Sequence, residues 1–377
     1  MNILLAPDSF KGSLSAVNAI KAMQTGIHRI SPDIITSGIP LSDGGEGFVD
    51  ALITSCGGKV LRKQVTGPLG KPVTARYGLI ENGKTGIIEM AAAAGLPLVN
   101  AGQRNPLRTT TFGVGELILA AVKNGCTTII IGAGGSATVD GGIGLLQALG
   151  VLFLDDKGKP IGRGGKELPK IHSMNSDALD RFSHIKFSVA TDVTNPLCGR
   201  QGAARIYGPQ KGATPEAVQL LDRGLNHYAG IIKRQLHKEI SSIPGTAAAG
   251  GLAAGLHAFM NADIVSGVDI VLEKSDLETA LKGCDLVITG EGRTDRQTLN
   301  GKAPFGVARL AKKYGVPVVC ISGSLGRGID RLYDEGFSAL LSLCDEPMDK
   351  AAAMANASRL LADAAENVVR LFLWREG

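Results

Sequence analysis

Carboxylate and lysine side chains directly follow apolar, strand-like segments of this sequence. In "NILLAPDSFKGS" (2–13) the apolar part is followed by Asp8, Ser9 and Lys11. In "FSVATDVTNP" (187–196) it is followed by Asp192. A carboxylate after a strand can take a proton from a hydroxyl as a general base, and a lysine can stabilise phosphoryl charge. For Lys11 the alternative is a solvated side chain beside a helix that Ser13 caps.

The glycine-rich stretch "TTIIIGAGGSATVDGGIGLLQALG" has the composition of a phosphate-binding turn between a strand at 127–131 and a helix that reaches Leu149. Glycines allow close backbone approach, and a helix N-terminus offers unpaired N–H groups. Candidate phosphate contacts are Gly134, Gly135, Ser136, Ala137, Thr138 and Asp140. The same stretch also fits the dinucleotide fingerprint, with Asp155 at the right distance for an NAD ribose. A third alternative is a glycine turn packed on a neighbouring strand.

Three further turns carry charged residues. In "PLSDGGEGF", Asp43 and Glu46 suit Mg²⁺ or substrate hydroxyls, although acids also favour a helix start. In "VITGEGRTDRQTLNGKAP", Glu291 and Arg293 follow a strand, and "GPQKGAT" presents Lys211 in a basic glycine turn. Asp295 and Lys302 lie in the same segment as Glu291, for which anionic-ligand contacts and loop solvation are both open, whereas the Lys211 turn could take phosphate or carboxylate.

The segment "GLIENGKT" at 78–85 satisfies the best-known ATP-binding pattern, G-x-x-x-x-G-K-[ST]. A phosphate loop needs a helix after it, but "KTGIIEM" is β-branched and strand-like. Asn82-Gly83 is a strong hairpin signal because both turn positions require positive φ. We therefore predict a β-hairpin over 72–90, with Lys84 as a solvated turn residue.

Apolar strand segments alternate with amphipathic helices along most of the chain, a pattern typical of parallel sheets. Strands are expected at 2–9, 127–135, 187–194, 285–293, 317–324 and 337–343, and helices at 14–30, 112–124, 215–236, 303–314 and 349–373. Hairpin and loop character interrupts this rhythm at 60–90 and 151–170. The predicted fold class is α/β, a doubly wound lobe (1–64, 105–150 and 278–377) with a second, inserted mixed α/β lobe (65–104 and 151–277).

Composition narrows the function classes. The formal net charge of +5 is scattered, without a Lys/Arg run interleaved with aromatics, so nucleic acid is not an expected partner. The six cysteines show no C-x-x-C spacing, which favours reduced thiols in a cytoplasmic protein. No apolar run approaches the roughly 20 residues that span a bilayer, so no membrane partner is expected.

Seven motifs together resemble the bacterial class I glycerate kinases. They are "APDSFKGSLSA", "PLSDGGEG", "IEMAAAAGL", "GGSATVDGGIGLLQALG", "TDVTNPLCG", "GPQKGAT" and "VITGEGRTDRQTLNGKAPFGVA", in the family's order and from Ile3 to about Gly323. The resemblance implies a flavodoxin-like lobe, a second α/β lobe and an active site between them. It also implies transfer of the γ-phosphoryl group of ATP to D-glycerate with Mg²⁺, giving 2-phosphoglycerate, and it selects phosphate over NAD for the 132–140 turn. One departure is Val139, where the family often has Asn.

The resemblance also orders the candidate roles. We expect the N–H groups of 134–138 and Ser136 to hold ATP phosphates, and Asp192, with Asp8 next, to act as the base. Lys11 would offset charge on the transferred group, and Arg293 or Lys211 would hold the carboxylate of glycerate. Mg²⁺ would bind Asp43 and Glu46, or Asp192. Ser9, Asp43, Glu46 and Glu291 complete the predicted substrate contacts, while the choice of C2 or C3 hydroxyl and the oligomeric state are not determined by the sequence.

Overall fold

The computed structural model describes residues 1–374 and divides the chain into two compact units. The first contains 1–43, 50–56 and 268–374, and the second contains 44–49 and 57–267, so the second is inserted into the first in sequence. These units differ from the predicted lobes at 44–49, 57–64 and 105–150, which belong to the second unit, and at 268–277, which belongs to the first. The reason is strand pairing: β6 (Thr128–Gly132) lies between β5 (Thr85–Glu89) and β9 (Lys186–Ala190), and β3 (Lys59–Thr66) pairs with β4 (Pro72–Ile80).

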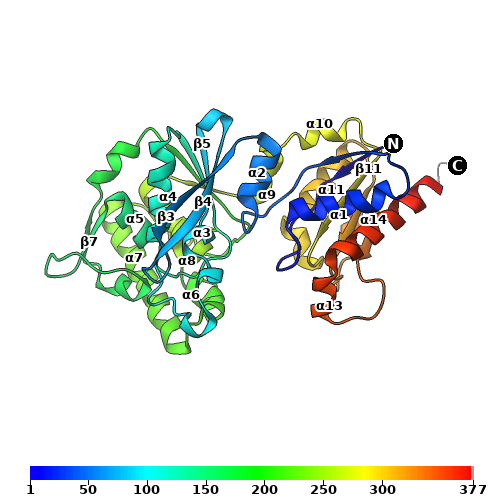
Figure 1. Cartoon of the computed structure of the whole chain (residues 1–377). Helices are drawn as coiled ribbons and strands as arrows, with labels where there is room; N and C mark the ends of the chain where they lie inside the picture. Colours follow the sequence, from blue (N-terminus) through cyan, green and yellow to red (C-terminus); the bar gives the residue numbers. More distant parts are fainter. Residues whose placement is uncertain (375–377) are drawn as a thin grey trace. The chain divides into compact units, whose positions relative to one another are not determined.

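The first unit, of which β11, α1 and α14 are labelled in Figure 1, is built on a five-stranded parallel sheet in the order β13-β12-β11-β1-β2. The strands are β1 (Asn2–Leu5), β2 (Ile35–Gly38), β11 (Leu286–Glu291), β12 (Val318–Ser322) and β13 (Ala339–Ser342). By order along the chain this is 2-1-3-4-5, the flavodoxin-like arrangement of a doubly wound sheet. The predicted fold class is thus confirmed.

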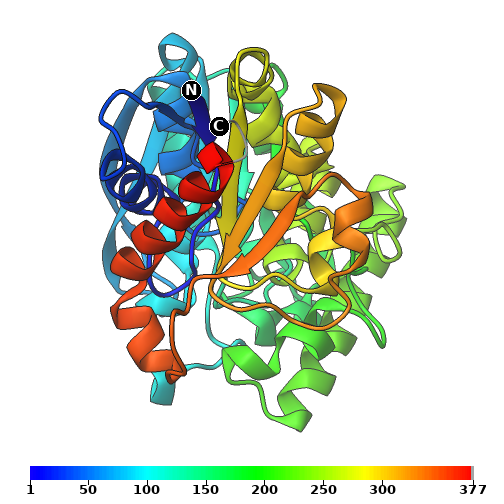
Figure 2. The same ribbon diagram turned by 90° about the vertical axis from the view of Figure 1, so that its right-hand side faces the viewer.

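Helices α1 (Ala16–His28) and α14 (Ala357–Trp374) pack against each other and share a core with one face of the sheet (Figure 2). A Cβ atom on Gly26 would lie 1.9 Å from the Ala362 carbonyl oxygen, so the two helices approach too closely for any other residue there. Ser15, not Ser13, caps α1. The remaining helices of this unit are α2 (Phe48–Cys56), α9 (Gly267–Lys274), α10 (Leu277–Leu281), α11 (Ala303–Lys313), α12 (Arg331–Asp334), α13 (Lys350–Ala355) and the short η7 (Arg296–Asn300). The first two residues of α2 and the first residue of α9 belong to the second unit.

The second unit has a six-stranded mixed sheet in the order β10-β9-β6-β5-β4-β3, with β10 at Asp263–Val265. Its antiparallel part contains the predicted hairpin, in which β4 and β5 pair through Ile80 and Thr85. Asn82 and Gly83 have φ of 56° and 85°, and Lys84 is exposed. The segment that matches the ATP-binding pattern is therefore a hairpin turn, as predicted.

Helices and a small two-stranded sheet of β7 (Leu152–Leu154) and β8 (Ser173–Asn175) complete the second unit. The helices are α3 (Ala91–Ala94), α4 (Phe112–Lys123), α5 (Ile143–Leu149), α6 (Ala203–Tyr207), α7 (Pro215–Leu236) and α8 (Ala248–Met260); short η segments cover Glu81–Gly83, Leu96–Leu98, Ala101–Gln103, Gly165–Lys170, Asp177–Phe182 and Pro209–Lys211. Across residues 1–374, every helix is too short or too polar to cross a membrane.

Candidate active site

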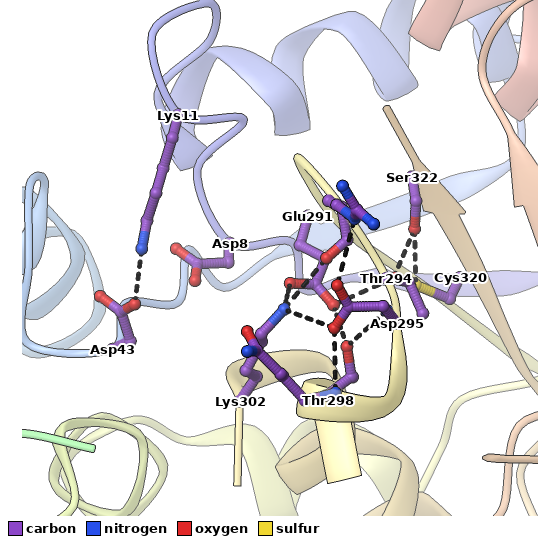
Figure 3. A network of polar contacts seen from close by, with 12 residues as sticks. Asp8, Lys11, Asp43, Glu291, Thr294, Asp295, Thr298, Lys302, Cys320 and Ser322 are labelled. Carbon is purple, nitrogen blue, oxygen red and sulfur yellow. Dashed lines mark hydrogen bonds and ion pairs between the residues drawn. The ribbon is translucent and has the colours of Figure 1, made fainter. Parts of the chain in front are cut away.

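The first unit gathers charged side chains where β1 and β11 end, a group that we call the acid–lysine centre: Asp8, Lys11, Asp43, Glu291 and Lys302 (Figure 3). The Asp8 N–H donates to the carbonyl of Gly290 over 2.8 Å, which fixes the turn after β1 to β11. One Asp8 oxygen, Oδ1, accepts from the Ser9 N–H at 2.6 Å. Lys11 Nζ lies 2.8 Å from Asp43 Oδ2. The structure thus brings together predicted site residues from the beginning of the chain and from the segment after β11.

Burial makes the Asp8 carboxyl an unusually weak acid. The side chain is 6% exposed, and this burial, followed by the negative charge of Asp43, raises the pKa of its carboxyl from 3.8 to about 7. The Ser9 N–H and the Lys11 ammonium act in the opposite direction. A carboxyl with this pKa is partly ionised at neutral pH, as a general base working there requires.

Glu291 is held on both oxygens by protein groups. Its Oε1 accepts from the Thr294 and Thr298 hydroxyls at 3.0 and 2.7 Å, and its Oε2 lies 3.0 Å from Lys302 Nζ. The Thr294 and Thr298 hydroxyls were not predicted at the site, although "GRTDRQTLNGK" supplies both, and Lys302, expected to contact an anionic ligand or solvent, pairs with Glu291. Glu291 therefore fixes the position of Lys302 in the structure, and its predicted contact with substrate stays a prediction.

Arg293 differs from these residues because its side chain is 67% exposed and its Nε lies 3.1 Å from Asp295 Oδ2. An exposed guanidinium that already has a carboxylate partner is a weak anchor for a second one. Ser9 is half-buried beside Asp8.

In the second unit, the turn after β6 is packed into its own fold. The N–H groups of Gly134 and Ala137 donate to the carbonyls of Gly44 and Ala94 at 3.2 and 2.9 Å. A Cβ atom on Gly134 would lie 2.4 Å from Gly45 Cα. Close backbone packing therefore requires this glycine, and of the predicted phosphate donors only Gly135, Ser136 and Thr138 keep N–H groups without a hydrogen bond within residues 1–374.

Asp140 and Thr138 do not face a ligand space, contrary to expectation, since both are 0% exposed. Asp140 accepts from the Thr111 N–H and hydroxyl at 2.8 and 2.9 Å and from the Gly142 N–H at 3.1 Å. Burial raises the pKa of its carboxyl. Helix α5 starts only at Ile143, so Asp140 joins the turn to the start of α4 instead of presenting a helix N-terminus to phosphate. Val139 is likewise fully buried, which suits its apolar side chain.

Lys211 is the cation of this turn. Its side chain is 3% exposed, and Nζ donates to Ser136 Oγ and to the Thr138 carbonyl, each at 2.8 Å. Burial lowers the pKa of the amine to about 7, although the charge of Asp140 opposes this, and no ion pair holds it within the described residues. A cavity of about 150 Å³ lies beside it, lined by Lys211, the 133–136 turn, Val193 and residues 247–250 among others. A buried cation without an ion pair on the edge of a cavity favours an oxyanion as its partner.

Asp192 and Glu46 also lie in the second unit. Asp192 lies two residues after the end of β9 (Ala190), as predicted from the sequence; because Ala190 pairs with Gly132, Asp192 belongs to the same unit as the Ser136 turn and not to the other lobe, as the predicted boundaries had it. Glu46 is exposed and lines a different cavity of about 520 Å³ with Arg62 and Arg76, which face each other across β3 and β4. These two arginines were not predicted, because the register that pairs them is not visible in a single strand.

The donor set limits how the expected Mg²⁺ could bind. Among residues 1–374, no three His, Cys, Asp or Glu side chains form a group that could hold a metal ion. Mg²⁺ commonly binds one or two carboxylates and takes its other ligands from substrate phosphates and water. A carboxylate such as Asp43 or Asp192 fits that limited role, and a cage made entirely of protein ligands does not.

The dinucleotide alternative fails on strand pairing. Asp155 follows β7, which pairs antiparallel with β8 in a separate small sheet and not beside β6. The Asp155 carboxylate instead accepts from the N–H groups of Lys157 and Lys159 at 2.9 and 2.8 Å. It therefore closes a local turn.

Comparisons with known proteins agree along the whole chain. The glycerate kinase family matches residues 3–373. A glycerate kinase of Halalkalibacterium halodurans is 46% identical over 375 residues, 99% of both chains. The glycerate 2-kinase of Escherichia coli is 48% identical over 344 residues, 91% of this chain and 90% of its own. The crystal structure of a candidate glycerate kinase 2 from Salmonella typhimurium LT2 superposes with a TM-score of 0.87 at 44% identity, covering 100% of this chain and 99% of that one.

Proposed function

This chain belongs to the glycerate kinase family, and we propose that it transfers the γ-phosphoryl group of ATP to the C2 hydroxyl of D-glycerate. The product would be 2-phospho-D-glycerate. The choice of C2 is supported by the 48% identity to a relative named glycerate 2-kinase. Mg²⁺ bound with the nucleotide would supply neutralisation of phosphate charge.

The observation that carries this proposal is the buried carboxyl of Asp8 beside the Lys11–Asp43 pair, at the carboxyl ends of two neighbouring parallel strands. Ligands of open α/β sheets bind outside this end of the strands. A kinase that phosphorylates an alcohol needs a group to accept the hydroxyl proton and cations to balance the transferred group. The acid–lysine centre contains both.

Asp8 accepts the proton of the glycerate hydroxyl in this mechanism, because its pKa of about 7 leaves it partly ionised at neutral pH while its burial excludes water. Lys11 has a 68% exposed side chain, so it can move from Asp43 towards phosphoryl oxygens. Glu291 and its hydroxyl partners hold Lys302 in place. Asp192 is the alternative base, and a matched pair of variants separates the two.

For the carboxylate of glycerate we propose Lys211 over Arg293. Lys211 is buried without an ion pair within residues 1–374, and Gly135 and Ser136, whose N–H groups have no hydrogen bond within those residues, line the same cavity. Arg293 is already paired with Asp295. Asp43 is the proposed first-unit contact to Mg²⁺, with Glu46 and Asp192 as the predicted alternatives.

An ADP-release assay with and without D-glycerate tests the function. We expect ADP formation that depends on D-glycerate and on Mg²⁺. ATP hydrolysis that does not depend on D-glycerate, or the absence of ADP at every concentration of D-glycerate, would refute the proposed function.

A further inference from the structure

The first unit contains a cavity of about 360 Å³, which Lys11 lines but the other residues of the acid–lysine centre do not. It lies beyond the carboxyl ends of β1, β11, β12 and β13, the edge at which doubly wound sheets bind their ligands. Its walls come from the turns after these strands and from α13 with the start of α14. The volume falls within the range of about 300–1,000 Å³ that is usual for small-molecule sites.

The walls are chemically divided. Phe10, Leu343, Met348 and Met354 give the cavity an apolar surface, and Lys11 adds a cation that it shares with the acid–lysine centre. Further polar groups in the lining are Ser13, Ser324, Asp349 and a second lysine, Lys350. Methionine side chains adapt to flat, polarizable ligands. A largely apolar cavity with lysines in its wall suits a molecule with an aromatic part and an anionic part.

We propose that this cavity binds the adenosine part of ATP and that Lys11 is the lysine nearest the phosphate chain. The proposal rests on the proposed kinase function and adds the place where the nucleotide binds. Glycerate is an unsuitable occupant because it is small and has no apolar surface to match these walls.

The turn after β6 is a weaker nucleotide site than the sequence suggests. Two of its five predicted donors, the N–H groups of Gly134 and Ala137, are bonded inside the second unit. Its helix α5 has seven residues and begins only at Ile143, several residues after the turn. The cavity beside Lys211, at about 150 Å³, also lies below the usual range for a site that holds a nucleoside.

The wall formed by α13 is tied to the turn after β1. Ser13 Oγ donates to the Met354 carbonyl at 2.8 Å, which is the contact this serine makes in place of the expected helix cap. On α13 and α14 the lining residues Lys350, Ala353, Met354 and Ala357 follow helical i, i+3, i+4, i+7 spacing. One helical face therefore points into the cavity and the opposite face does not.

That geometry offers a matched pair of variants. Ala353→Phe places a ring inside the cavity, whereas Ala351→Phe places the same ring on the exposed face of the same helix. We expect Ala353→Phe to raise the Kd for ATP at least about tenfold, equivalent to about 1.4 kcal/mol, with Ala351→Phe near wild type. Binding is measured by calorimetry without glycerate, and melting curves confirm that both variants fold. Equal Kd values for the two folded variants would overturn the proposal.

Photolabelling of the unmodified protein gives an independent test. A photoreactive azido-ATP should label peptides that contain residues 340–357, and excess ATP should prevent the labelling. Labelling confined to the peptide that contains residues 133–140 would refute the location while leaving the kinase function intact. Protection by ATP at 340–357 in a protein that releases no ADP with D-glycerate would instead contradict the proposed function and leave the site standing.

Discussion

Replacing Asp8 with Asn should slow the enzyme and stabilise the fold at the same time. As the proposed base, Asp8 cannot be replaced by an amide, so kcat should fall by about 10²–10⁴. In the wild type, kcat/KM should decline as pH falls through about 7, because protonated Asp8 cannot accept the hydroxyl proton. The Asn variant should lack this limb of the pH profile.

The stability effect follows from the same carboxyl. Its pKa rises from 3.8, the ordinary value of a solvated aspartate, to about 7 in the fold. Because each unit of this difference in pKa corresponds to about 1.36 kcal/mol, ionising the buried carboxyl lowers the free energy of unfolding by about 4 kcal/mol. The folded state holds the proton more tightly than the unfolded chain. Asp8 therefore lowers stability progressively as pH rises from about 4 through 7. A buried amide that lacks an acceptor costs about 1–3 kcal/mol, which leaves an expected gain of about 1–3 kcal/mol for Asp8→Asn at high pH.

Urea unfolding followed by circular dichroism at about pH 5 and about pH 8.5 measures this gain, which should be larger at the higher pH. Asp192→Asn is the control, because the rival base is only half-buried. A variant Asp8→Asn with near-normal kcat, or one that loses stability at the higher pH, would refute the reasoning. A large loss of kcat in Asp192→Asn with Asp8→Asn unaffected would transfer the role of base to Asp192.

Three other substitutions test separate parts of the account. Lys84→Ala should leave kcat and both KM values within about twofold, since the residue lies on an exposed hairpin turn, and a steady-state assay that found a large loss would restore the phosphate-loop interpretation. Lys211→Met should raise the KM for D-glycerate by at least about tenfold without lowering the melting temperature, because an apolar side chain replaces a buried cation. In the wild type that KM should rise above about pH 7 as Lys211 loses its proton, and a flat profile would contradict its role. Gly134→Ala should destabilise the second unit by about 1–3 kcal/mol in urea unfolding, because its Cβ would lie 2.4 Å from Gly45 Cα; unchanged stability would show that the turn can move.

The alternation of apolar segments and glycine turns predicts most of the parallel strands, but not the short edge strands β2 and β10. All six expected strands are present, since each is a short apolar run that ends in a polar turn. The predicted lobe boundaries differ from the observed units because the parallel segment at 128–132 has the same local pattern in either sheet. Only its pairing with Thr85–Glu89 places it in the mixed sheet of the second unit.

The candidate site shows a similar division. The position of Asp8 and Lys11 after the first strand is visible in the sequence, but their link to Asp43 depends on a contact across 32 residues. The glycines of 132–142 suggested phosphate, whereas Gly134 is needed for packing against Gly45. Composition alone cannot distinguish these causes, because a close approach of backbone and a close approach of phosphate both require glycine.

The product of the reaction tests the central claim most directly. Phosphorus and carbon NMR of a mixture of the protein, ATP, Mg²⁺ and D-glycerate should show a phosphate ester at C2, formed in step with ADP. An ester at C3 would contradict the proposed regiochemistry, and unaltered D-glycerate in the presence of consumed ATP would contradict the phosphoryl transfer itself.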